Sequence, residues 1–521
     1  MESKVKNPVL GKMTIIGKPR HFFSRGGDSL MIDLRMHAHI RHTLISRIIE
    51  SKIEADAVIL AGGGEVNMYD SDTVWDFRQE SNFQYLFGVK EPGCFGLIKM
   101  QPAMSVLFVP RFPQEYAQWF GPIKPTEWFK ETYLVDQVYY VDEMETVLGS
   151  ENLGIKSLLY YDYMNQDSGV QLPVPNNFKG SDNFKFIAGP GLANIINEMR
   201  LIKTDPEIQI LQYTNDVTCR AHIDTMKSLY TESFGKVCSM EHFAETNFRF
   251  RSGLEGCARV GYNCIACSGI NNAILHYGHA AEPNNDTVQR GSLRLIDMGA
   301  EYHCYTADVT VTFPTNGKFT DDQKTVYEAV LAAVEKVEST LAPGIDYKDM
   351  HRLSHRVMLE ELVRTSDLFL TTDVDELVRL NICSYFSPHG LGHSLGLMVH
   401  DVAIEPGKVK EKVDPTIKGL RLQRVLEENM VLTVEPGIYF IEYLMDELAS
   451  DPARSKLINF AAVERCRRNV GGVRIEDNVV ITADGCRVLT DVPRKVGDIE
   501  AVMRGEKDWK VGDHYRTYKN H

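Results

Sequence analysis

The segment SPHGLGHSLGLMVHD, residues 387–401, places His389, His393 and His400 in a glycine-rich, largely apolar stretch. A neutral imidazole is a common metal ligand and a common general base. A histidine taken singly is more often a buried loop residue, so the function of this stretch depends on whether acidic partners occur elsewhere in the chain.

Four acidic residues interrupt segments that otherwise have the pattern of buried strands: Asp297 in LRLIDMGA, Asp308 in CYTADVTVTF, Glu435 in MVLTVEPGIYF and Glu476 in GGVRIEDNVVI. Burying a carboxylate is costly unless it is paired or bound to a metal. Any one of the four could face water from an edge strand. Together with His393 they supply a ligand set that suits two divalent ions, such as Mn²⁺, Co²⁺ or Zn²⁺, about 3.5–4 Å apart.

The order and spacing of these five residues resemble the metal-ligand set of the pita-bread metallopeptidases. Within that family the chain is most similar to the prolidases, the Xaa-Pro dipeptidases of the eukaryotic cytosolic type. The matching stretches extend along most of the chain: DFRQESNFQYLFGVKEPGCFG, LFVPR, KTDPEIQILQYTN, ILHYGHAAEPN, PHGLGHSLGLMVHD, VLTVEPGIYFIE and GGVRIEDNVV. The resemblance implies an α/β N-terminal domain followed by an α+β pita-bread catalytic domain.

The resemblance also implies two divalent metal ions per chain, with Mn²⁺ as the first expectation and Co²⁺ or Zn²⁺ as alternatives. Their ligands would be Asp297, Asp308, His393, Glu435 and Glu476. Asp308 and Glu476 resemble the bridging carboxylates. Glu435 is expected to be the catalytic proton shuttle, because in the family it lies beside the bridging water.

Further residues of the site are implied in the same way. His276, in LHYGHA, and His400 resemble catalytic and substrate-binding histidines that stabilise the oxyanion or position the substrate. Arg421, fourteen residues before Glu435, matches an arginine that binds the free proline carboxylate and so enforces dipeptide length. Tyr262 is expected among the substrate-binding residues, and His389 in the layer that supports the ligands.

The expected activity is metal-dependent hydrolysis of Xaa-Pro dipeptides, in which an activated hydroxide attacks the peptide carbonyl. One alternative is an aminopeptidase P, which acts on longer peptides with proline in the second position. Another is a pita-bread protein that binds without catalysis, although such relatives typically lose metal ligands and all five are present here. The chain departs from the family at Met398 and in the loop after Asp401, close to the expected substrate.

Length, charge and composition limit the number of domains, the kinds of partner and the cellular location that we expect. At 521 residues the chain exceeds the size of one hydrophobic core, so at least two domains are expected. The formal net charge of −14, without a basic block, argues against a nucleic-acid partner. The N-terminal stretch lacks an apolar signal core and no run is long enough for a membrane helix. The ten cysteines lack a disulfide framework, Cys264 and Cys267 fit a packed strand, and a cytoplasmic location is expected.

The predicted boundary divides the chain into domains 1–190 and 191–521, with a linker at the polar segment 165–189. In the first domain, residues 37–52 are predicted to be a helix with His37, His39 and His42 facing solvent, and residues 83–89 (FQYLFGV) a strand. In the second, residues 292–314 are predicted to form two strands with a turn at Gly299. Helices are predicted from a Thr320/Gln323 capping box and over 346–364.

The resemblance further implies a homodimer, in which the N-terminal domain of one chain lies near the active-site mouth of the other. The aromatic residues of FRQESNFQYLFG, residues 77–88, are predicted to line that contact.

Overall fold

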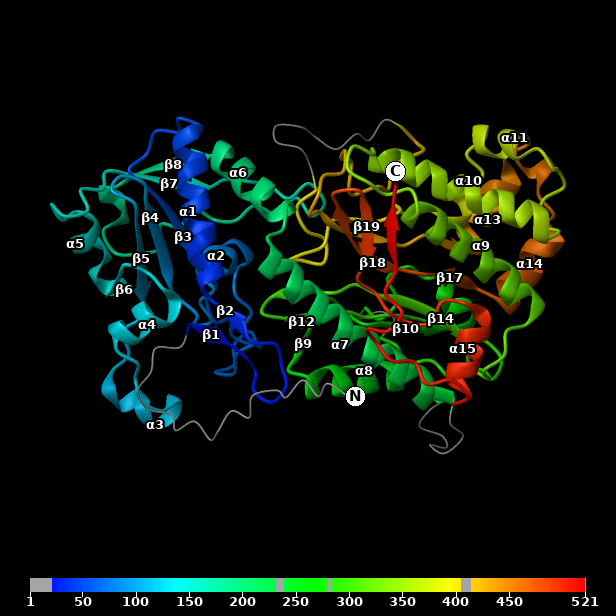
Figure 1. The fold of residues 1–521 in the computed structure, drawn as a ribbon, viewed down its shortest axis with the longest axis horizontal. Helices are drawn as coiled ribbons and strands as arrows, with labels where there is room; N and C mark the ends of the chain where they lie inside the picture. The colour runs from blue at the N-terminus through cyan, green and yellow to red at the C-terminus, as the bar shows by residue number, and fades with distance from the viewer. Residues whose placement is uncertain (1–20, 231–238, 280–282, 404–413, 521) are drawn as a thin grey trace, which may run out of the picture.

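The structure is a computed structural model that describes residues 21–230, 239–279, 283–403 and 414–520. Residues 1–20, 231–238, 280–282, 404–413 and 521 lie outside these ranges. Figure 1 shows two parts side by side: a smaller one, blue to cyan, around one sheet, and a larger one, green to red, around several sheets. The predicted fold class, an α/β domain followed by an α+β domain, is confirmed.

The smaller part is a mixed six-stranded sheet in the order β6-β5-β4-β3-β7-β8. Both faces of the sheet are covered, as the alternation along its central strand requires. Val58 and Leu60 join the main core, which includes the buried face of α1, whereas Ala57 and Ile59 join a separate cluster on the other face. The strands are β3 (Ala57–Ala61), β4 (Phe95–Lys99), β5 (Met104–Val109), β6 (Gln137–Tyr140), β7 (Ser157–Tyr161) and β8 (Lys185–Gly189).

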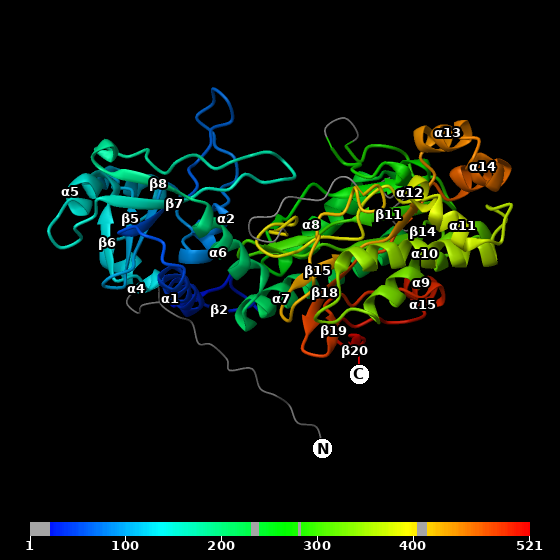
Figure 2. The ribbon, with the colours of Figure 1, turned by 90° about the horizontal axis from the view of Figure 1, so that it is seen from above.

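The helices of this part, with the short hairpin that precedes them, are β1 (Phe22–Phe23), β2 (Ile32–Asp33), α1 (Arg35–Glu50), α2 (Ser81–Phe87), α3 (Ala117–Phe120), α4 (Thr126–Tyr133), α5 (Met144–Leu148) and α6 (Pro190–Leu201). Helix α6 packs against α1 and β7. It is followed by the long helix α7 (Asp205–Tyr230), which Figure 2 shows extending from the smaller part into the larger one.

The larger part contains four antiparallel sheets, in the orders β10-β11-β14, β13-β12-β9, β15-β18-β19-β20 and β16-β17. Their strands are β9 (Arg259–Val260), β10 (Ile265–Ser268), β11 (Leu293–Asp297), β12 (Ala300–Tyr302), β13 (Tyr305–Thr306), β14 (Thr310–Pro314), β15 (Val431–Val434), β16 (Gly437–Tyr439), β17 (Gly472–Arg474), β18 (Asp477–Thr482), β19 (Gly485–Val488) and β20 (Thr517–Lys519).

Helices surround these sheets: α8 (His242–Leu254), α9 (Asp321–Glu338), α10 (Tyr347–Thr365), α11 (Val374–Arg379), α12 (Cys383–Phe386), α13 (Glu442–Ser450), α14 (Phe460–Asn469) and α15 (Val496–Met503). The predicted capping box is confirmed. The Thr320 hydroxyl accepts a hydrogen bond from the Gln323 backbone N–H, and the Gln323 side-chain oxygen accepts one from the Thr320 backbone N–H. The helix predicted over 346–364 is α10.

The prediction of a strand at residues 83–89 is wrong, because residues 81–87 form α2. The Glu80 carboxylate accepts hydrogen bonds from the backbone of Asn82 and Phe83, and Gly88 ends the helix with a positive φ of 64°. Phe83, Tyr85 and Phe87 are fully buried, so they cannot line a contact between two chains. The predicted dimer contact is therefore wrong for these three residues, whereas Phe77 of the same stretch is half-buried and its part of the prediction stays untested.

The two strands predicted over 292–314 are four. Chain reversal occurs at His303 and Cys304, whose φ angles of 51° and 65° form the tight turn of the β12–β13 hairpin. Sequence reasoning missed it because neither residue is a glycine. The flanking strands β11 and β14 then pair with each other, with Asp297 opposite Thr310.

Two further predictions in the smaller part need correction. The linker predicted over 165–189 is too long, since residues 185–189 are β8, paired in parallel with β7. His37 is fully buried instead of facing solvent, because the α1 face that carries it packs against α2, and it contacts His303 and the Tyr85 carbonyl. Among the described residues, no helix has the length and apolar character needed to cross a bilayer.

Candidate metal and active site

Strand register brings four acidic residues to one place in the larger part. Asp297 ends β11 and pairs with Thr310 of β14. Asp308 lies two residues before Thr310 and so comes close to Asp297. Glu435 and Glu476 sit where two paired chain segments both pass from one sheet to the next. Val434 pairs with Asp477 on one side of this break, and Gly437 pairs with Arg474 on the other. The acids that interrupt apolar strands in the sequence are thus the residues at which the strands change sheet.

His393 reaches the same place because its loop runs beside β15. The backbone of Thr433 donates to the His393 carbonyl at 2.9 Å, and the Glu435 backbone donates to the Leu391 carbonyl at 2.8 Å. Gly392 makes this approach possible, since a Cβ there would lie 2.2 Å from the Thr433 carbonyl oxygen. The glycines of the stretch therefore allow the loop to pack against its neighbours.

The side chains of the predicted ligands meet in the interior. His393 Nε2 lies 3.3 Å from Asp308 Oδ2 and 3.5 Å from Glu435 Oε1. One ligand atom each from Asp308, His393 and Glu476 fall within 4.8 Å of one another. Asp297 is held at the edge of this group by two donors, the Tyr262 hydroxyl at 2.6 Å and the Arg474 guanidinium at 2.7 Å.

Crowding of buried carboxylates raises their pKa values. Burial raises the pKa of Asp308, and the charge of Asp297 raises it further. The pKa of Glu435 is raised to about 7, chiefly by burial and also by Asp308, while His393 acts in the opposite direction. Burial, followed by the charges of Asp308 and Glu435, raises the pKa of Glu476 well above its ordinary range. A bound cation would remove this repulsion.

The donor set fits divalent metal. Glu476 Oε1 is buried and makes no hydrogen bond within the described part of the chain, although its other oxygen accepts from Thr310 at 2.8 Å. A buried carboxylate oxygen without a donor is costly, and a bound metal ion is one partner that satisfies it. Carboxylates with one imidazole suit Mn²⁺, Co²⁺ or Zn²⁺.

Sequence reasoning missed a supporting network centred on Arg474. Arg474 donates to Asp297 and to the Tyr439 hydroxyl, the latter at 2.9 Å, and that hydroxyl lies 2.9 Å from His389 Nε2. His389 Nδ1 is 3.9 Å from Glu435, so the network connects the predicted ligands Asp297 and Glu435. A signal was available, because Arg474 precedes Glu476 by two residues and the alternation of a strand places residues with this spacing on the same face.

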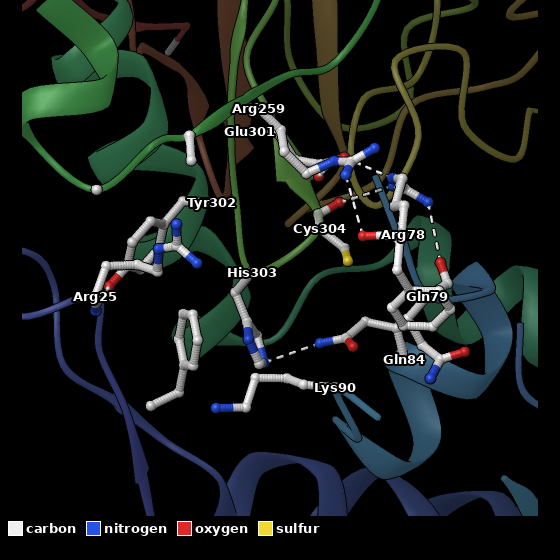
Figure 3. A pocket seen from close by; sticks show the side chains of 14 residues that line it. Arg25, Arg78, Gln79, Gln84, Lys90, Arg259, Glu301, Tyr302, His303 and Cys304 are labelled. Atoms are coloured by element: carbon white, nitrogen blue, oxygen red, sulfur yellow. Dashed lines mark hydrogen bonds and ion pairs between the residues drawn. The ribbon is translucent and has the colours of Figure 1, made fainter. Parts of the chain in front are cut away.

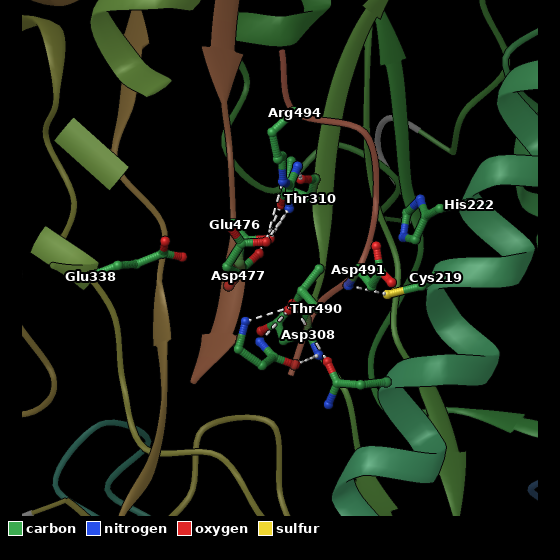
Figure 4. A network of polar contacts seen from close by, with 12 residues as sticks. Cys219, His222, Asp308, Thr310, Glu338, Glu476, Asp477, Thr490, Asp491 and Arg494 are labelled. Carbon is green, nitrogen blue, oxygen red and sulfur yellow. Dashed lines mark hydrogen bonds and ion pairs between the residues drawn. The ribbon is translucent and has the colours of Figure 1, made fainter. Parts of the chain in front are cut away.

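A second layer fixes the backbone around the ligands, and Figure 4 shows Arg494 between Thr310 and the pair Glu476 and Asp477. Arg494 donates to the Thr310 carbonyl at 2.7 Å, to the Glu476 carbonyl, and to the Asp477 carboxylate at 2.6 Å. Asn478 accepts from the Asp308 backbone at 2.9 Å and donates to the Asp308 carbonyl. Both bridging candidates are therefore held through their main chains as well as their side chains.

The predicted substrate residues lie around this cluster at different depths. The His400 ring packs edge-on against the His393 ring with centroids 4.5 Å apart. His276 is exposed overall. Desolvation by the surrounding chain, Arg474 and His279 together lower its pKa, with a further lowering by Arg421 against the opposing charge of Asp297. Arg421 NH1 lies 3.2 Å from Asp167 of the smaller part, and both side chains are about one-third exposed, at 30% and 34%. The ion pair with Asp167 was not predicted.

A buried cluster of carboxylates and one histidine that could hold metal lies between antiparallel strands of the larger part, which follows an α/β domain. Residues 209–483 match metallopeptidase family M24, and residues 37–159 match the aminopeptidase P N-terminal domain. The chain belongs to metallopeptidase family M24.

More particular similarities extend over nearly the whole chain. It is 45% identical to the Xaa-Pro dipeptidase of Mus musculus over 489 residues, 93% of this chain and 97% of that protein. It is 44% identical to the Xaa-Pro dipeptidase of Homo sapiens over 486 residues, covering 93% and 96%. Among solved structures, the aminopeptidase PepP of Pseudomonas aeruginosa matches with a TM-score of 0.71 and 29% identity, covering 91% of this chain and 98% of that one.

Proposed function

We propose that this protein hydrolyses Xaa-Pro dipeptides with two divalent metal ions bound per chain, Mn²⁺ being the first expectation and Co²⁺ or Zn²⁺ the alternatives. The observation that carries the proposal is the convergence of buried Asp308, His393 and Glu476, one with an unsatisfied oxygen, in a chain similar end to end to Xaa-Pro dipeptidases. Asp297 and Glu435 would complete the ligand set.

When bound, such ions supply an activated water near neutral pH and polarise the peptide carbonyl. The chain supplies proton transfer and positioning. Glu435 is the proposed proton shuttle, since it lies beside His393 and is the least enclosed of the ligand acids, with 18% of its side chain exposed. It would take a proton from the attacking water and return it to the departing proline nitrogen.

His276 and His400 are the proposed contacts for the scissile peptide. His400 lies against His393, so a substrate carbonyl near the cluster comes within its reach. His276 lies on the Arg421 side, and its lowered pKa keeps it neutral, which suits hydrogen bonding to a developing oxyanion. Tyr262, with its hydroxyl on Asp297, would border the substrate.

Arg421 is the proposed anchor for the free proline carboxylate. It is partly exposed and already pairs with a carboxylate, that of Asp167, which indicates geometry suited to an anionic partner. A substrate carboxylate would exchange with Asp167. Recognition of a free C-terminus in this position favours a dipeptide over a longer chain.

We also propose a homodimer, a cytoplasmic location and a domain division near residue 190. Exposed aromatic side chains gather at and before α3, with Trp119 76% and Phe120 70% exposed, and they replace the buried α2 residues as the candidate contact with a second copy. The described cysteines carry free thiols, which suits a reducing compartment.

Comparison of Gly-Pro with Gly-Pro-Ala as substrates of the Mn²⁺-treated protein tests the proposed specificity. We expect Gly-Pro to be cleaved with the higher kcat/KM. Faster cleavage of the tripeptide would assign the chain to the aminopeptidase P type, which the similarity to PepP makes the second candidate.

A further inference from the structure

A pocket lies at the junction of the two parts, and none of the five predicted metal ligands borders it. Its volume is about 230 Å³. It is bordered by the segments around Phe23 and Arg78 from the smaller part and by the β12–β13 hairpin from the larger one. Figure 3 shows Arg25 on one side and Arg78 with Arg259 on the other, with the Cys304 thiol directed into the space between them. The proposed peptidase mechanism uses none of these side chains.

Cations outnumber acids in the lining. Arg25, Arg78, Lys90 and Arg259 all border the pocket, whereas Glu301 is the acid among its lining residues. Glu301 is shared, lying 2.6 Å from Arg78 and 3.4 Å from Arg259. One carboxylate therefore neutralises at most one of two neighbouring guanidinium groups.

The other two cations, Arg25 and Lys90, lack an acid partner among the residues that the structure describes. Neither Arg25 nor Lys90 forms an ion pair with any residue in the described ranges. Lys90 Nζ instead lies over the Phe23 ring, 4.8 Å from its centre. Burial lowers the pKa of Lys90, and Lys124 and Arg25 lower it further against the opposing effect of Glu91. Arg25 is therefore near enough to Lys90 for the two positive charges to repel each other.

The lining also has an apolar side and a limited size. The rings of Phe23, Phe77 and Tyr302 border the pocket. Its volume is below the ~300 Å³ at which typical small-molecule sites begin, so the occupant is no larger than one ring bearing one anionic group. Two unpaired cations beside aromatic rings match a dianion attached to an apolar body, and a phosphate monoester carries about −1.5 to −2 charges at pH 7.

We propose that this junction pocket binds a small organic phosphate monoester, with Arg25 and Lys90 contacting the phosphate and the aromatic rings contacting the organic group. Arginine and lysine are the usual phosphate partners in proteins. The site is separate from the proposed metal centre.

The test uses the metal-loaded full chain and phenyl phosphate, with phenol and succinate as comparison ligands, at about 0.1 M salt so that diffuse surface attraction is screened. Calorimetry should give a dissociation constant below about 1 mM for phenyl phosphate. Lys90→Met and Arg25→Met should each weaken it at least tenfold. Lys336→Met is the matched control: this exposed lysine on α9 forms no ion pair within the described residues, and its loss should change nothing.

A second readout locates the ligand without a variant. Cys304 is partly accessible, whereas the other cysteines that the structure describes are buried, so its alkylation by iodoacetamide can be followed by peptide mass spectrometry. Phenyl phosphate should slow this alkylation several-fold in the unaltered protein. If phenyl phosphate binds at the metal centre instead, it will not slow Cys304 alkylation, and Lys90→Met will bind it as tightly as the unaltered protein does. That result would overturn the proposal. Equal binding of phenol, equal binding of succinate, or equal weakening by Lys336→Met would overturn it as well.

Discussion

Replacing Arg421 with Ala tests the proposed basis of dipeptide length. A charge-assisted contact with the proline carboxylate contributes about 1.5–3 kcal/mol. The substrate must first displace Asp167, and a partly exposed pair of this kind is worth about 0–1 kcal/mol. The net loss in Arg421→Ala is therefore about 0.5–3 kcal/mol, or roughly two- to 160-fold in kcat/KM for Gly-Pro.

The assay compares Gly-Pro with its C-terminal amide, which has no carboxylate for Arg421 to bind. We expect the slower hydrolysis of the amide to be nearly unchanged in Arg421→Ala, and Arg421→Lys to restore the dipeptide rate only in part, because an ammonium lacks the planar fork. Asp167→Asn should raise kcat/KM for Gly-Pro by up to about fivefold, since the competing carboxylate is gone.

Arg352→Ala is the matched control, because Arg352 is an exposed arginine of α10 that pairs with Asp349 and Asp414 and, among the described residues, forms no ion pair with any of the five predicted ligands. Metal content should stay the same in every variant. An equal fall in dipeptide and amide hydrolysis, or loss of metal, would show that Arg421 is structural and would refute the reasoning.

Asp308→Ala or Glu476→Ala should abolish hydrolysis and lower bound metal below two ions per chain by elemental analysis; full activity with unchanged metal would contradict the ligand assignment. Gly392→Ala should cost metal and activity, because its Cβ would meet the Thr433 carbonyl at 2.2 Å, whereas Gly497→Ala, with open space around it, should not. The acids whose pKa values are raised bind protons more tightly in the folded chain than in the unfolded chain. In the metal-free protein, the stability that these protonated groups contribute is therefore lost as pH rises above about 4.5. The gap in Tm between Mn²⁺-loaded and chelator-treated protein should therefore widen from pH 5.5 to 8, and a constant gap would show that these carboxylates are not the metal site.

The ligand acids could be predicted from sequence because each breaks an apolar strand pattern, which is costly without a partner. His393 could be found only in combination with them. Arg474 carried a usable signal, since it stands two residues from Glu476 in the same strand pattern. The pair of Arg421 with Asp167 carried none, because it joins residues from separate parts of the chain that no local pattern relates.

The errors in the fold have equally specific causes. Residues 83–89 have strand-like composition, but the Glu80 cap and the terminal Gly88 impose a helix, and burial on all sides removes the amphipathic period. The hairpin at His303 and Cys304 uses positive φ angles without glycine, which sequence patterns do not reveal. His37 lies on the apolar face of α1, three residues before Ile40, but its burial depends on His303, a partner from a distant part of the chain that no local pattern indicates.

Titration of chelator-treated protein with Mn²⁺, following Gly-Pro hydrolysis against metal equivalents, tests the central claim most directly. The account predicts negligible turnover without metal and a rise that levels off at two equivalents per chain. Full turnover without divalent metal, or turnover that does not change as Mn²⁺ is added, would contradict the central claim. That claim is that a dinuclear catalytic centre is formed by Asp297, Asp308, His393, Glu435 and Glu476.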